Sequence, residues 1–161
     1  MITFNKFELS ETKANNYLQA INSIKEIIDP EINLYGNLAN IAGLLNYFLK
    51  DINWVGFYLV SKGRLEVGPF IGLPACTKID FNKGVCGTAW AQSKTIIVPD
   101  VNKFAGHIAC DSASKSEIVV PIIKDGKVLG VIDIDSHLYN NFDEIDKKHL
   151  ETIAKSLKQL F

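Results

Sequence analysis

The chain contains three cysteines, whose thiols could act as nucleophiles, redox groups or metal ligands. Cys76, Cys86 and Cys110 all lie within residues 69–116, in stretches rich in glycine, alanine, serine and aspartate. An odd number of cysteines cannot be used up by internal structural disulfides, so at least one thiol needs another explanation. Lone cysteines are often simply buried, but small and polar neighbours are more typical of reactive thiols. We therefore favour redox chemistry, in which a nucleophilic thiol becomes a sulfenic acid that a second thiol resolves to a disulfide.

A metal site is an alternative use of the same residues. With His107, the three thiols would give a tetrahedral set of three cysteines and one histidine. The spacings C-x9-C and H-x2-C do not match the paired cysteines typical of structural zinc sites. We therefore expect no metal, and His107 is left without an assigned role.

Three acids are expected to meet at one end of a hairpin. Asp133 and Asp135 alternate with apolar residues, so both point to the same face of a strand. A two-residue turn at Asp125-Gly126 would place Glu117 opposite position 134, between the two aspartates. Such a cluster should raise the pKa of some carboxyls, so that an acid can donate a proton or bind an ammonium group. A solvent-facing strand end is the alternative for the two aspartates.

Two aromatic residues could form a wall beside these acids. Trp54 and Tyr58 are four positions apart on an expected strand and share a face, with Gly56 between them leaving an open floor. Core packing is the alternative for each residue alone. With the acids, they would make a pocket with apolar walls and a few polar anchors, as small-molecule sites have.

The expected elements place these residues on an α+β scaffold. Helical periodicity covers residues 11–28 and 34–50, and a last helix starts after Asp143, a good N-cap. Four strands form two hairpins, over residues 52–60 and 64–68 and over residues 117–123 and 127–135. We expect residues 69–116 to be mostly loop with short strands. This order predicts a mostly antiparallel sheet.

Composition narrows the possible functions. The 161 residues, 47% of them apolar, suit one domain over residues 1–161, and a net charge of -1 argues against nucleic acid as a partner. No apolar stretch approaches the roughly 20 residues that span a bilayer. The first residues do not form a signal peptide, so we expect a cytoplasmic protein without a membrane partner.

Several motifs resemble one enzyme family. The runs Gly84–Ala89, Gly106–Pro121 and Leu129–Ser136, with Trp54–Tyr58, closely resemble the free methionine-R-sulfoxide reductases, which are single GAF-domain enzymes. The resemblance extends from the first expected helix to the last. It implies a six-stranded antiparallel sheet with flanking N-terminal and C-terminal helices, and a homodimer.

The resemblance also implies an activity and residue roles. The activity is reduction of free methionine-R-sulfoxide to methionine without flavin, haem or metal, with electrons from thioredoxin or a similar dithiol. By position, Cys110 matches the nucleophile, and Cys76 and Cys86 match the resolving pair. The other matched residues are the pocket acids Glu117, Asp133 and Asp135, of which Glu117 or an aspartate supplies protons, and the aromatic wall of Trp54 and Tyr58. A non-catalytic GAF sensor of small molecules is the alternative.

Overall fold

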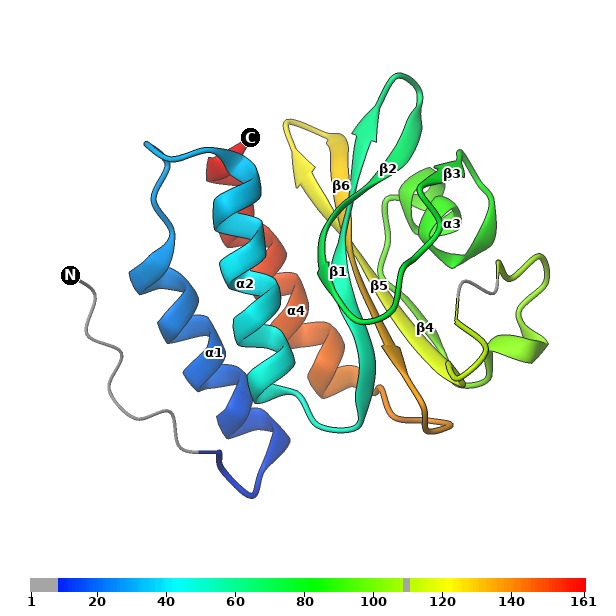
Figure 1. Ribbon diagram of the computed structural model, residues 1–161, viewed down its shortest axis with the longest axis horizontal. Helices are drawn as coiled ribbons and strands as arrows, with labels where there is room; N and C mark the ends of the chain where they lie inside the picture. Colours follow the sequence, from blue (N-terminus) through cyan, green and yellow to red (C-terminus); the bar gives the residue numbers. More distant parts are fainter. Residues whose placement is uncertain (1–8, 109–110) are drawn as a thin grey trace.

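A computed structural model describes residues 9–108 and 111–161 of the chain. Figure 1 shows helices α1, α2 and α4 covering one face of a sheet, while α3 lies on the other face. The helices are α1 (Lys13–Ile27), α2 (Leu34–Phe48), α3 (Gly84–Gln92) and α4 (Glu144–Leu157), with short 3-10 turns at Val101–Lys103 and Lys158–Leu160. The strands are β1 (Ile52–Ser61), β2 (Arg64–Ile71), β3 (Lys78–Asp80), β4 (Ile96–Val98), β5 (Ser116–Lys124) and β6 (Lys127–Ser136).

The six strands form one sheet in the order β3-β2-β1-β6-β5-β4. Every neighbouring pair is antiparallel. The predicted α+β class with a six-stranded antiparallel sheet is confirmed, and both predicted hairpins are present. The long central strands β1 and β6 join the two hairpins, so residues from both halves of the chain meet at the middle of the sheet.

Helix ends follow the predicted capping chemistry. Asp143 caps α4, accepting hydrogen bonds from the backbone N–H groups of Ile145 and Asp146, and Asp146 returns the contact to the Asp143 N–H. The buried Asp146 carboxyl also accepts hydrogen bonds from Lys13 Nζ at 2.6 Å and from the Tyr17 hydroxyl at 2.8 Å. One acid therefore joins the starts of α1 and α4.

The expectation of loops through residues 69–116 is wrong at α3. Gly84 begins this helix with φ +60°, and Gly87 lies so close to β3 that a Cβ would meet the Asp80 carbonyl oxygen at 2.5 Å. These glycines suggest a loop in the sequence, but they allow a helix to start abruptly and pack tightly. Cys86 is therefore a helix residue, not a loop residue.

Two apolar clusters cover opposite faces of the sheet. The larger one packs α1, α2 and α4 against one face, and the smaller one packs α3 against the other. In β6, Ile132 and Ile134 point to the larger cluster, so the intervening acids point to the α3 face. Within the described ranges, no helix is both long and apolar enough to cross a membrane.

Candidate active site

The sequence-predicted pocket residues meet in a cavity on the α3 face of the sheet. The enclosed space measures about 30 Å³. That volume suits a water molecule or an ion, whereas drug-sized ligands occupy pockets of roughly 300–1,000 Å³. The walls combine carboxyls, aromatic rings and a thiol, and they include Trp54, Tyr58, Leu73, Cys86, His107, Ile108, Asp111, Ser114, Glu117, Asp133 and Asp135.

The three acids lie together, but in a different register from the one expected. The hairpin turn has the predicted left-handed conformation at Asp125 and Gly126, with φ values of 51° and 76°. An irregularity between Ile122 and Ile123 shifts the pairing by one position, so that Glu117 lies directly opposite Asp135. The predicted position between the two aspartates is wrong, because a bulge inserts one extra residue beyond the turn.

Burial dominates the electrostatics of the cluster. Glu117 and Asp133 are each only 6% exposed. Burial, followed by repulsion from Asp135, raises the pKa of Glu117, and burial followed by Glu117 raises that of Asp133. Burial likewise raises the pKa of Asp135. Like charges at this spacing cannot all ionise cheaply, so the cluster retains protons that exposed carboxyls would lose.

Two further contacts complete the acid cluster. The Nε2 atom of His107 lies 3.5 Å from Oε2 of Glu117. Burial lowers the pKa of this histidine, which favours the neutral ring. Asp133 interacts with Cys86 and Glu117, yet its Oδ1 atom is buried without a hydrogen-bond partner in the described part of the chain. An unpaired buried carboxylate oxygen is costly and points to a missing partner.

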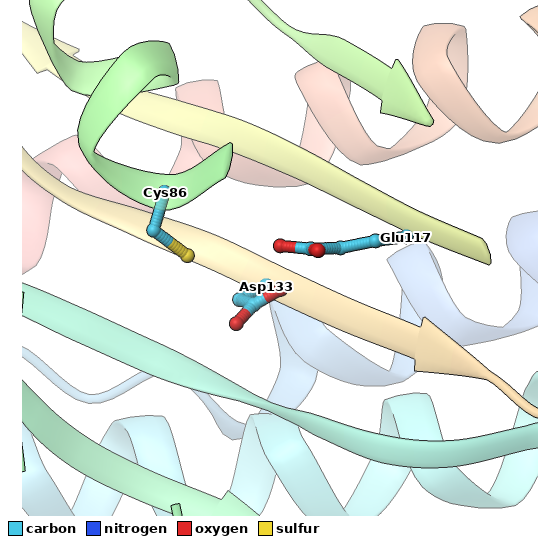
Figure 2. Close-up of side chains that lie close together, drawn as sticks. All are labelled: Cys86, Glu117 and Asp133. Carbon is cyan, nitrogen blue, oxygen red and sulfur yellow. The ribbon is translucent and has the colours of Figure 1, made fainter. Parts of the chain in front are cut away.

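Cys86 projects from α3 toward these acids. Figure 2 shows its sulfur facing the carboxyls of Glu117 on β5 and Asp133 on β6. The sulfur and one oxygen of each carboxyl all lie within 4.8 Å of one another. Cys86 is a free thiol and only 3% exposed, and burial, then Asp133, raise its pKa. The expected exposed, reactive setting is wrong for this cysteine, because α3 packs it onto the sheet.

The other two cysteines differ from Cys86. Cys76 is half-buried and disulfide-bonded. Cys110, the predicted nucleophile, lies outside the described residues. The described chain resumes at Asp111, which lines the cavity.

The aromatic wall is present, but Gly56 leaves no open floor. The rings of Trp54 and Tyr58 stack at a centroid distance of 5.9 Å, and Trp54 also stacks on Phe70 at 5.2 Å. A Cβ on Gly56 would meet the Phe70 Cβ at 2.3 Å, so Phe70 and the indole fill that space. Trp54 Nε1 donates to the Leu73 carbonyl, which ties the wall to the β2–β3 loop.

One set of residues was missed by sequence reasoning. Asn53 Nδ2 donates to Asp111 Oδ2 at 2.9 Å and to Ser114 Oγ at 3.1 Å. These bonds join the start of β1 to the turn before β5, and Ser114 hydrogen-bonds Asp135. Asn53 lies 58 residues from Asp111 in the chain, and no local pattern predicts such a pairing.

Comparison with known proteins assigns this architecture to a class. The GAF domain family matches residues 44–160, which include every strand and the α3 face. The sheet and the cavity between α3 and the strands therefore lie within the GAF domain of this chain.

Close relatives narrow the class further. The free methionine-R-sulfoxide reductase of Saccharomyces cerevisiae is 50% identical over 149 residues, covering 88% of this chain and 83% of that protein. The enzyme of the same name from Escherichia coli is 39% identical over 148 residues, covering 92% and 90%. The structure of a Neisseria meningitidis free methionine-R-sulfoxide reductase in complex with its substrate is 40% identical, with a TM-score of 0.91 and coverage of 98% and 96%. The chain belongs to the free methionine-R-sulfoxide reductases of the GAF domain family.

Proposed function

We propose that the protein reduces free methionine-R-sulfoxide to methionine in the α3-face cavity. Two relatives that match most of the chain are named free methionine-R-sulfoxide reductase, and the structure of a third such reductase was solved in complex with its substrate. The observation that carries the proposal is the buried group of Glu117, Asp133 and Asp135 beside the stacked rings of Trp54 and Tyr58. This combination suits a small zwitterion with one cationic and one apolar end.

Different residues of the cavity recognise the two ends of the substrate. An ionised carboxyl of the cluster binds the substrate ammonium, a group that a methionine residue inside a peptide lacks. The rings of Trp54 and Tyr58 contact the methyl group at the other end. The cavity of about 30 Å³ is too small for an amino acid, so the segments around Leu73 and Ile108 must move apart to admit it.

The reduction transfers one oxygen atom from substrate sulfur to enzyme sulfur. The Cys110 thiolate attacks the sulfoxide sulfur, and Glu117 or Asp135 delivers a proton to the oxygen as the S–O bond polarises. In the resulting adduct the oxygen moves from the substrate sulfur to the Cys110 sulfur, while the S–O bond to the substrate and the new S–S bond both break. Methionine leaves with the sulfur electron pair, and Cys110 is left as a sulfenic acid. The sulfur of Cys110 is oxidised by two electrons and the substrate sulfur is reduced by two.

Cys76 is the proposed resolving thiol. It attacks the sulfenic acid, a disulfide forms and water leaves, which prevents further oxidation of the nucleophile. Cys76 is disulfide-bonded already, whereas Cys86 is a free thiol enclosed by acids, and resolving thiols need access. Cys86 was matched to the resolving pair on sequence, and this proposal leaves it outside the disulfide step.

An external dithiol completes the cycle. Thioredoxin or a similar protein attacks the disulfide through a mixed disulfide and takes over the oxidation. Because the chain's own thiols and carboxyls perform every step, we propose no resident cofactor. A cytoplasmic location and a homodimer are part of the same proposal, on the family resemblance.

The test is methionine formation from each pure diastereomer of free methionine sulfoxide, with a dithiol reductant. We expect activity on the R form, no activity with Cys110→Ser, and one turnover with Cys76→Ser. Equal turnover of a peptide-bound sulfoxide would contradict the recognition of the ammonium. Folded, reduced protein that converts neither diastereomer would favour a non-catalytic GAF sensor.

A further inference from the structure

The proposed reaction leaves one buried nucleophile without a task. Cys86 does not enter the disulfide step, yet its sulfur lies within 4.8 Å of a Glu117 oxygen and an Asp133 oxygen. All three side chains are at least nine-tenths buried. A buried thiol between two buried carboxyls is an expensive arrangement unless something binds them.

We propose that Cys86, Glu117 and Asp133 bind a thiophilic divalent cation, with Zn²⁺ as the best fit. Thiolate sulfur and carboxylate oxygen are both zinc ligands, and a thiolate disfavours Mg²⁺ and Ca²⁺. Zinc–ligand bonds of about 2.0–2.3 Å place two ligands of one ion roughly 3–4 Å apart. Small side-chain adjustments therefore bring this set into range. Figure 2 shows that the three side chains come from α3, β5 and β6 and converge on one point.

A second observation points to a missing cation at this position. Asp133 Oδ1 is buried without a hydrogen-bond partner in the described ranges, so it has an acceptor site available. His107, whose Nε2 lies 3.5 Å from Glu117 Oε2, stands beside this three-residue group without belonging to it. This set differs from the three-cysteine set considered from the sequence, because only one thiol takes part.

The size of the cavity determines which ligand fits without a conformational change, a metal ion or the substrate. About 30 Å³ holds an ion and excludes an amino acid. A bound ion would link α3 to both strands and occupy the carboxyls proposed to bind the substrate ammonium. Zn²⁺ should therefore act as an inhibitor that competes with methionine sulfoxide. This consequence for activity rests on the proposed function, whereas metal binding itself does not.

The test is a direct titration of the protein with Zn²⁺, and with Co²⁺ as a spectroscopic probe, without reductant. Omitting the reductant preserves the disulfide at Cys76 and leaves Cys86 as the free thiol of the described residues. We expect one ion per chain and a thiolate-to-Co²⁺ charge-transfer band. Cys86→Ser should remove the band and weaken Zn²⁺ binding at least about 100-fold, and Asp133→Asn at least about tenfold, since loss of outer-shell partners alone costs 10–100-fold.

Control variants distinguish this site from other ligands. His137→Ala, which removes an exposed histidine, should bind as the wild type does. Bound Zn²⁺ should also protect Cys86 of the wild-type chain from alkylation, a measurement that needs no variant to fold. A band that persists in folded Cys86→Ser, absence of Zn²⁺ binding, or alkylation unaffected by Zn²⁺ would each overturn the proposal. Because none of these readouts is catalytic, their failure leaves the reductase assignment standing.

Discussion

One face of the sheet buries apolar side chains, whereas the other buries carboxyl groups beside a cavity. On the helix face, α1, α2 and α4 cover a continuous apolar cluster that includes Leu45, Ile132 and Ile153, all buried. On the α3 face, the same strands present Glu117 and Asp133 to a cavity, at almost the same burial. Residues two positions apart on β6 thus share a face, and neighbours face opposite environments.

The helix face supplies most of the stabilising burial, and the α3 face holds the groups proposed to carry out the chemistry. Apolar burial stabilises by about 25 cal/mol per Å², and the helix face has most of the buried apolar residues. The buried acids on the other face oppose folding. On folding, each carboxyl must either stay charged without a counter-charge or take up a proton that it lacks in the unfolded chain at neutral pH. Changes on the two faces should therefore separate activity from stability.

The largest effect is expected from Glu117→Gln on the α3 face. Loss of a proton donor should lower kcat/KM for free methionine-R-sulfoxide by about 10²–10⁴-fold. The free energy of unfolding should not fall, because an amide replaces a buried carboxyl of nearly the same shape. Steady-state kinetics and urea unfolding on one sample measure both quantities. Glu151→Gln, on α4 outside the cavity lining, is the matched control, because the amide oxygen can still accept from the Thr95 hydroxyl. Equal activity loss there would contradict the separation.

Leu45→Ala should have the converse effect. Leu45 is fully buried on the helix face, and truncating a buried leucine costs about 3–5 kcal/mol in cavity and transfer terms. Activity per folded molecule should stay within about twofold, because the residue does not line the pocket. Urea unfolding gives the first quantity and an assay normalised to folded protein gives the second. A large fall in kcat for the folded fraction would show that the two faces are coupled.

Asp146→Ala should destabilise by about 3 kcal/mol. The change removes the side chain that accepts from the Asp143 N–H in the capping box of α4. It also removes one acceptor of Lys13 and the acceptor of the buried Tyr17 hydroxyl. Thermal unfolding measures the loss, and Asp146→Asn should recover part of it by keeping an acceptor for Tyr17. An unchanged Tm would mean that the junction of α1 and α4 contributes little.

Gly56→Ala is expected to have the smallest cost, about 1–3 kcal/mol from overpacking. The new methyl group would overlap the Phe70 Cβ at 2.3 Å and the end of the Trp54 indole at 2.7 Å, so the aromatic wall beside the cavity must shift. KM for the sulfoxide should rise more than kcat falls. Gly63→Ala, at a turn glycine whose Cβ would have open space, is the comparison for strain alone, since its φ is +76°. A KM that rises equally in both variants would contradict the local cause.

Local patterns in the sequence determined most of the scaffold. Helical periodicity located α1, α2 and α4, and Asp143 marked the start of α4. The Asp125-Gly126 turn and alternation along β6 brought Glu117 close to the two aspartates on one face. The family resemblance supplied the class and the proposed roles of the cysteines. The helices, the cap and the hairpin depend on residues that are close to one another in the chain, so local sequence patterns reveal them.

The assembly of the site depends on contacts between distant segments of the chain. The bulge at Ile122 and Ile123 moved Glu117 opposite Asp135, and close packing on β3 turned a glycine-rich stretch into α3. That helix buried Cys86 against the acids, and Asn53 joined β1 to Asp111 across 58 residues. Burial, register and cavity size depend on which distant segments pack together. A linear pattern can show which groups are available, but packing sets their distances and their surroundings.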